Sequence, residues 1–296
     1  MENQDMEYMF HKQGPFWHLC TPGTNQEILF RDDDDYRFGI TSAAICLEDS
    51  VRIYALAIMS NHLHDILAGK ACDCLAYFER RKKVLKKYLD SEGKTVDMRE
   101  FNGKLIPIEN LDALRTEIVY VNRNGYVASP KYTPFSYPWS TGMYYFNPAS
   151  WEGAFDYSEM PYKEKRILTH SRIRDLPPTY KVKDGTIHIP SFVRVKEGEG
   201  WFRDAHQYFN LLSRNREAYG EVAKRLGDEV FLTDNELFDA VCAHCRSRFG
   251  QPRPSALSPN DKVSVAVLMK REYNASNGQI RRMLRLDDHV VRELFP

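Results

Sequence analysis

The order of strand-like and helix-like segments in the first 125 residues restricts the fold more than any other feature. Residues 14–21 (GPFWHLCT) and 51–58 (VRIYALAI) show the aromatic and β-branched alternation of half-buried strands. Residues 32–47, between them, open with an acidic run suited to a helix N-terminus and continue with apolar residues at helical spacing. Residues 62–67 (HLHDIL) follow the second strand after a short connection, which predicts an antiparallel hairpin. The chain therefore begins β-α-β-β.

The pattern continues with two more helices and one more strand. Residues 72–89 mix apolar side chains with many arginines and lysines, which predicts an amphipathic and strongly basic helix. A β-prone piece at 104–108 precedes a helix from about 111 to 125, which Gly125 ends. The order β-α-β-β-α-β-α predicts an α+β fold. We expect a ferredoxin-like antiparallel sheet with helices on one face and the other face available for a partner.

Beyond about residue 150 the pattern changes. Residues 130–200 are rich in proline and scattered aromatic residues and show no sustained period, whereas helical patterns return from Trp201 onward. We therefore expect a domain over 1–150, an irregular connection over 151–200 and an all-helical region over 201–296.

The helical region should contain several separate helices. The expected ranges are 204–215, 218–226, 234–249 and three short helices between 261 and 295. The last two, 276–284 and 288–295, flank a short turn, which is typical of a helix-turn-helix at about 261–296. Arg281, Arg282 and Arg285 are candidates there for contacts with phosphates or base edges. Any small bundle of three helices has a similar periodicity.

Composition limits the cellular setting. No apolar run approaches the ~18 residues that a membrane helix needs, and the N-terminal residues lack the basic and apolar regions of a signal peptide. The 6 cysteines of this 296-residue chain do not make the framework of a small secreted domain and fit a reducing cytoplasm. The formal net charge is zero, but local basic runs can contact phosphates while acidic segments cancel their charge. Neutrality therefore does not exclude DNA.

His62-Leu63-His64 is the most informative tripeptide. On a strand, residues i and i+2 point to the same face, so both imidazoles can reach one metal ion. The spacing alone has low specificity, because a surface strand with two exposed histidines gives the same pattern. The surrounding sequence and a second motif downstream add to it.

Three segments carry a resemblance to a known family: 58–64 (IMSNHLH), 120–128 (YVNRNGYVA) and 137–140 (YPWS). In this order they resemble the motifs of the single-tyrosine HUH transposases, especially the REP-associated tyrosine transposases. That likeness covers about the first half of the chain. Three ordered motifs are more specific than any one of them.

The resemblance implies a function and a set of site residues. His62 and His64 would hold a divalent ion, Mg²⁺ or Mn²⁺, and Tyr120 would attack a DNA phosphodiester. Asn124 matches a polar helix position of the family, and its i+4 spacing from Tyr120 would let it complete the metal shell. The family acts on single-stranded or hairpin DNA through a 5′-phosphotyrosine and works as a homodimer.

The sequence departs from the family pattern at three positions. Ser60 and Gly125 replace prolines, and Asp65 stands where an apolar residue is usual. None of the three changes removes a catalytic atom. Asp65 should lie on the strand face opposite His62 and His64, so burial of its carboxylate would require a partner.

Several other residues have a functional and a structural interpretation. The candidates for phosphate contact are Arg80, Arg81, Lys82, Lys83, Lys86, Lys87 and Arg123. Charge runs of this kind are also common on solvated helix faces. Tyr132, Phe135, Tyr137 and Trp139 could stack on unpaired bases, although core packing is the more common role of such residues. Cys242 and Cys245 are interpreted as helix packing.

Three functions remain open from the sequence. The preferred one is a transposase that cuts and rejoins DNA strands with a tyrosine nucleophile. The alternative is a domesticated, non-catalytic protein that recognises repeated hairpin elements. A replication-type HUH nickase is a third possibility, which the YPWS segment at 137–140 disfavours.

Overall fold

A computed structural model describes most of the chain. The described residues are 3–21, 28–94, 96–99, 101–128, 132–133, 135–171, 175–214, 234–273 and 275–295. The chain divides into two compact units, Met1–Asp228 and Glu229–Pro296. The first unit is longer than the expected 1–150 domain. The helix expected at 218–226 lies outside the described residues.

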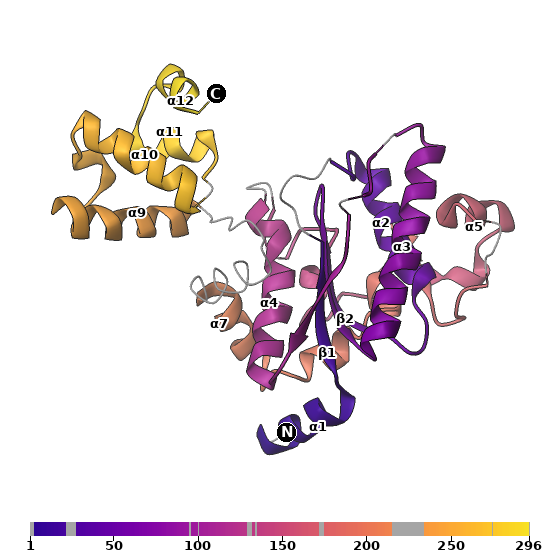
Figure 1. The fold of residues 1–296 in the computed structure, drawn as a ribbon. Coiled ribbons are helices and arrows are strands. Elements are labelled where there is room, and N and C mark those ends of the chain that lie inside the picture. The colour runs from indigo at the N-terminus through magenta and orange to yellow at the C-terminus, as the bar shows by residue number, and fades with distance from the viewer. Residues whose placement is uncertain are drawn as a thin grey trace. The chain divides into compact units, whose positions relative to one another are not determined.

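A four-stranded antiparallel sheet lies at the centre of the first unit (Figure 1). Its strands are β1 (Phe16–Cys20), β2 (Arg52–Ile58), β3 (Leu63–Ala68) and β4 (Lys104–Ile108). They are arranged in the order β2-β3-β1-β4. The strands expected from the sequence are confirmed, including the hairpin of β2 and β3.

Helices lie on both faces of this sheet. The helices are α1 (Asn3–Gln13), α2 (Asp33–Cys46), α3 (Ala71–Ser91) and α4 (Leu111–Ala128). Figure 1 shows α2 and α3 on one side of the strands and α4 on the other. The expectation of one open face is therefore wrong. After β4 the chain crosses to the second face, where α4 buries the apolar side chains of Leu114, Ile118 and Val121.

The start of α2 follows from the acidic run that precedes it. The Asp32 side chain accepts a hydrogen bond from the Asp35 backbone N–H at 3.0 Å, which caps the helix. Acidic residues occupy the first turn, where their negative charge interacts favourably with the positive end of the helix dipole.

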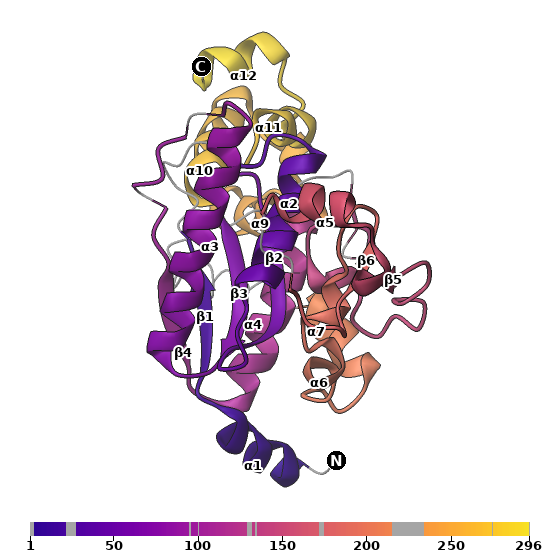
Figure 2. The same ribbon diagram turned by 90° about the vertical axis from the view of Figure 1, so that its right-hand side faces the viewer.

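The stretch after α4 is packed into the first unit. It contains the helices η1 (Thr141–Met143), η2 (Tyr157–Glu159), α5 (Tyr162–Thr169), η3 (Ile189–Ser191), α6 (Val195–Glu199) and α7 (Ala205–Arg214). A second antiparallel sheet is formed by β5 (Phe155–Asp156), β6 (Lys181–Lys183) and β7 (Thr186–Ile187). In Figure 2, α5 lies beside α2, and α7 and α6 lie near α4 and β2. The rings of Tyr145 and Tyr208 stack with centroids 5.3 Å apart, and both side chains are fully buried. The expected irregular connection over 151–200 is thus a folded part of the unit.

The described part of the second unit is helical. It comprises α9 (Asp234–Phe249), η4 (Pro254–Ala256), α10 (Pro259–Tyr273), α11 (Asn277–Leu284) and α12 (Asp288–Leu294). Ser276 and Gln279 form a capping box at the start of α11, and Arg285 ends it with a left-handed backbone (φ 52°). The helices expected at 276–284 and 288–295 are confirmed. Within the described ranges, no helix combines the length and apolar character needed to cross a membrane.

Candidate active site

His64 lies in β3, His62 immediately precedes that strand, and both side chains are buried. Their rings are perpendicular, with centroids 5.1 Å apart. His64 has Ala57 of β2 and Cys20 of β1 as its neighbours in the sheet, and these small side chains leave room for an imidazole. The alternative of two exposed histidines on a surface strand is therefore wrong, since His62 is 6% exposed and His64 is fully buried.

Tyr120 of α4 lies against the same histidine. Its ring centroid is 5.5 Å from that of His64, in an edge-to-face arrangement. Because α4 crosses the sheet face from which His64 projects, residues far apart in the sequence meet there. The Tyr120 side chain is 1% exposed.

Two residues that the sequence did not single out complete the cluster. His18 of β1 and Glu117 of α4 are fully buried, and His18 Nδ1 lies 2.6 Å from Glu117 Oε2. On its other side, His18 Nε2 lies 3.0 Å from His64 Nδ1. Glu117 precedes Tyr120 by three residues on one helix face, so a carboxylate on an otherwise apolar stripe was a usable signal.

The separation of the His62 and His64 rings is compatible with two ligands of one divalent metal ion. Metal–nitrogen bonds of about 2.1 Å place the centres of two ligand imidazoles roughly 5 Å apart, as the rings of His62 and His64 are. His62 Nδ1 lies 2.8 Å from Asn61 Oδ1, an acceptor, and His64 Nδ1 is engaged with His18. Each ring therefore has its Nδ1 in a hydrogen bond, the usual arrangement of a histidine that binds metal through Nε2.

Asn124 is the third residue that the sequence nominated as a ligand. It lies on α4 four residues after Tyr120 and is 4% exposed. In the described ranges, no group of three or more histidine, cysteine, aspartate or glutamate side chains is placed to hold a metal ion. An asparagine oxygen would have to join the two histidines.

Asp65 points to the opposite face of the sheet, as expected, and its partner is Arg81. Asp65 Oδ2 lies 2.8 Å from Arg81 Nη1, and both side chains are fully buried. Burial raises the pKa of the Asp65 carboxyl, and the guanidinium of Arg81 opposes that shift. Arg81 was expected to contact DNA. That expectation is wrong, because the side chain is inside the protein and neutralises Asp65.

The YPWS segment at 137–140 is hydrogen-bonded to the end of β2. Tyr137 donates a hydrogen bond to the carbonyl oxygen of Ile58 at 2.6 Å, and the Ile58 N–H donates to the carbonyl oxygen of Trp139 at 2.9 Å. The Tyr137 ring also lies against Gly125, where a Cβ atom would be only 1.9 Å from Tyr137 Cδ1. Gly125 is thus needed for this contact. Both aromatic side chains are buried, so Tyr137 and Trp139 serve packing.

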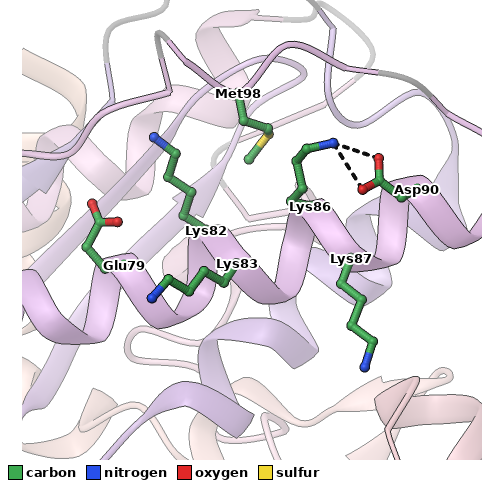
Figure 3. Close-up of a pocket in the computed structure, with 7 residues that line it drawn as sticks. All are labelled: Glu79, Lys82, Lys83, Lys86, Lys87, Asp90 and Met98. Carbon is green, nitrogen blue, oxygen red and sulfur yellow. Dashed lines mark hydrogen bonds and ion pairs between the residues drawn. The ribbon is translucent and has the colours of Figure 1, made fainter.

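Three lysines of α3, Lys83, Lys86 and Lys87, are exposed, and Arg80 and Lys82 are half-buried. This helix lies across the sheet from Tyr120 (Figure 1). Lys82, Lys83, Lys86 and Lys87 line a groove of about 460 Å³ with Met98 (Figure 3). In Figure 3, Lys82 and Lys86 lie on the side of α3 that faces Met98, with the Lys86 ammonium paired to Asp90, and Lys83 and Lys87 point to the other side. Arg80 forms an ion pair with Glu48 at 3.2 Å. These residues and Tyr120 therefore cannot contact the same phosphate.

The other residues expected to contact DNA differ in how exposed their side chains are. Arg123 is 4% exposed, so its guanidinium offers little surface to DNA. Arg281, Arg282 and Arg285 are exposed in the second unit. Phe135 is exposed and contacts Phe209, whereas the ring of Tyr132 packs edge-on against Tyr137.

The two cysteines of α9 are packed as expected. Cys242 and Cys245 are both buried, and Cys245 belongs to the apolar core of the second unit.

No protein-family model, curated protein or solved structure matches the chain.

Proposed function

We propose that the first unit is a single-tyrosine HUH module that cuts and rejoins single-stranded or hairpin DNA, with Tyr120 as nucleophile and His62 and His64 as metal ligands. The main support for this proposal is that the rings of His62, His64 and Tyr120 lie close together. The centroid of His64 lies 5.1 Å from that of His62 and 5.5 Å from that of Tyr120. A histidine pair that could hold a metal ion, placed beside a phenol, is the arrangement that such chemistry requires.

The topology supports the same assignment. The order β2-β3-β1-β4, with α2 and α3 as crossover helices, is what a ferredoxin-like sheet would have. The additional helix, α4, places Tyr120 on the face from which His64 projects. We assign the fold of the first unit to this class.

The reaction would exchange one phosphodiester for another. The Tyr120 oxygen attacks the phosphorus, the bond from phosphorus to the 3′ oxygen breaks, and the phenol proton is balanced by the proton that the 3′-hydroxyl gains. The product is a 5′-phosphotyrosine, from which a second 3′-hydroxyl displaces Tyr120 to rejoin a strand. A divalent ion would supply charge neutralisation at the phosphate and orient it, with Asn124 as its additional ligand.

Burial of Tyr120 has a consequence for this chemistry. A DNA strand must displace part of the covering structure before it reaches the 1% exposed side chain. We therefore expect slow adduct formation.

The test is a covalent adduct on a denaturing gel. Purified protein with Mn²⁺ and a panel of labelled single-stranded and hairpin oligonucleotides should give a slowly migrating band that EDTA abolishes. Tyr120→Phe should remove the band completely, because phenylalanine has no nucleophilic oxygen. Tyr208→Phe is the matched control, since Tyr208 is also fully buried but lies outside the histidine cluster. An adduct of undiminished yield with Tyr120→Phe would overturn the assignment of the nucleophile.

A second candidate function is DNA binding without turnover. The burial of Tyr120 favours it, because an inactive relative would keep the phenol as part of its core. The exposed Arg281, Arg282 and Arg285 of the second unit are its candidate contacts, with α11 and α12 as a helix-turn-helix. Salt-dependent binding of hairpin DNA with no adduct across the whole panel would establish this function instead. In either case we propose that the protein works on DNA as a homodimer.

A further inference from the structure

We infer that His18 and Glu117 are positioning residues that fix the orientation and tautomer of His64 for metal binding. This inference rests on the proposed function. It follows from two distances, 2.6 Å from His18 Nδ1 to Glu117 Oε2 and 3.0 Å from His18 Nε2 to His64 Nδ1. Together they form one hydrogen-bond chain that runs from α4 through β1 to β3.

Proton positions along the chain follow from the chemistry of its first member. An ionised carboxylate only accepts hydrogen bonds, so the proton is on His18 Nδ1, and this N–H donates the hydrogen bond that Glu117 accepts. A neutral His18 then has a lone pair on Nε2, which must accept from His64 Nδ1–H. This leaves the lone pair of a neutral His64 on Nε2, the atom that can bind a metal ion.

If the hydrogen bond between His18 and His64 ran in the opposite direction, His64 would have the other tautomer. A cationic His18 would donate from Nε2 to His64 Nδ1, and the proton of His64 would then be on Nε2. That tautomer has no lone pair for a metal ion at Nε2. Glu117 and His18 thus determine whether His64 is a ligand, although neither needs to touch the ion.

The hydrogen bonds among Glu117, His18 and His64 also hold the His64 ring rigidly. All three side chains are at most 1% exposed, and the contact between His18 and Glu117 is short and charge-assisted. His64 is therefore held in one orientation before any ion arrives. Loss of such outer hydrogen bonds typically weakens metal binding by about 10–100-fold.

The first experiment measures the tautomer directly in the full chain. Imidazole ¹⁵N spectra of the metal-free protein, assigned with His18→Gln and His64→Gln, should show His64 protonated on Nδ1. A His64 protonated on Nε2 would overturn the inference. This readout depends on neither metal nor activity.

The second experiment measures Mn²⁺ affinity by calorimetry in the full chain. Glu117→Met, which removes the acceptor, should weaken binding at least tenfold, whereas Glu117→Gln keeps an acceptor oxygen and should recover most of the affinity. Ile118→Val is the control for loss of packing on α4, and it should leave the affinity within twofold. If binding requires His62 and His64 but Glu117→Met leaves it unchanged, the positioning role is wrong and the metal site stands. If the wild type does not bind Mn²⁺, the metal site of the proposed function fails, and the positioning role fails with it.

Discussion

Replacing Arg81 with methionine should lower the free energy of unfolding of the first unit by about 3–5 kcal/mol. Methionine has a similar length but no charge, so the substitution leaves the carboxylate of Asp65 buried without its cation. Asp65 Oδ1 has no hydrogen-bond partner among the described residues, which leaves little to compensate for the loss. Arg81 Nε and Nη2 also bond to Ser42 Oγ and the Gly39 carbonyl of α2 at 3.2 and 3.3 Å, and these bonds would be lost as well.

Urea denaturation followed by circular dichroism measures this change. The double variant Asp65→Val, Arg81→Met removes both charges and should recover more than half of the lost stability, because a well-packed apolar pair can replace a buried ion pair. Recovery should be incomplete, since the Tyr77 hydroxyl loses Asp65 as its acceptor at 3.4 Å. Lys87→Met, at an exposed position on the same helix, should change stability by less than about 0.5 kcal/mol. A similarly small effect of Arg81→Met would mean that the buried ion pair does not form.

Replacing Gly125 with alanine should destabilise the first unit by about 1–3 kcal/mol, the usual cost of overpacking. Alanine in place of glycine would ordinarily stabilise a helix interior by about 1 kcal/mol. Here the added Cβ would lie 1.9 Å from Cδ1 and 2.1 Å from Cγ of Tyr137, so the ring must move. Its hydroxyl donates to the Ile58 carbonyl oxygen at 2.6 Å, and movement would break that bond. The steric cost therefore outweighs the helix gain.

A double-mutant cycle distinguishes this clash from a general effect on α4. In a Tyr137→Ala background the obstacle is absent, so Gly125→Ala should be neutral or stabilising there. The matched control is Gly278→Ala in α11, where the nearest atom to the new Cβ would be Nη1 at the flexible end of Arg282, 3.2 Å away. That substitution should not destabilise the second unit. If Gly125→Ala costs the same with and without the Tyr137 ring, the packing explanation is wrong.

The sequence predicted those parts of the fold that depend on local pattern. The strands and the helices α2, α3 and α4 each have a clear period, and so do α11 and α12. The end expected for α4 is wrong, because the helix continues through Gly125 to Ala128. The two-residue period of a strand predicted that the side chains of His62 and His64 would lie close together, and their rings are 5.1 Å apart. Their approach to Tyr120 was an implication of the family resemblance.

The remaining site residues depend on contacts between distant parts of the chain. A single histidine on a strand and a single glutamate on a helix are common, and 99 residues separate His18 from Glu117. Arg81 was misassigned because it lies in a basic run. Its spacing did contain a signal, since Tyr77 and Leu85, four residues before and after it, are buried on the same stripe of α3.

The structure of residues 151–200 could not be predicted from the sequence for another reason. Their short elements, such as β5 and β6, are too brief to show a period. Their burial is determined by partners elsewhere, as when Tyr180 Oη approaches the Ala44 carbonyl oxygen of α2 at 3.5 Å. Such pairings cannot be inferred from local composition.

The borders of the central sheet determine how copies of this chain can associate. Beyond β2, Ser140 pairs with Ala57 and Val193 pairs with Ile53, so the backbone of that border strand is already occupied. On the other border, β4 contains Pro107, which has no N–H to offer to an added strand, and the exposed charge of Lys104. Neither border is suited to recruit a strand from another molecule. Protection against fibril-like stacking is therefore built into the sheet, and a dimer of this protein would have to form through helix or loop surfaces.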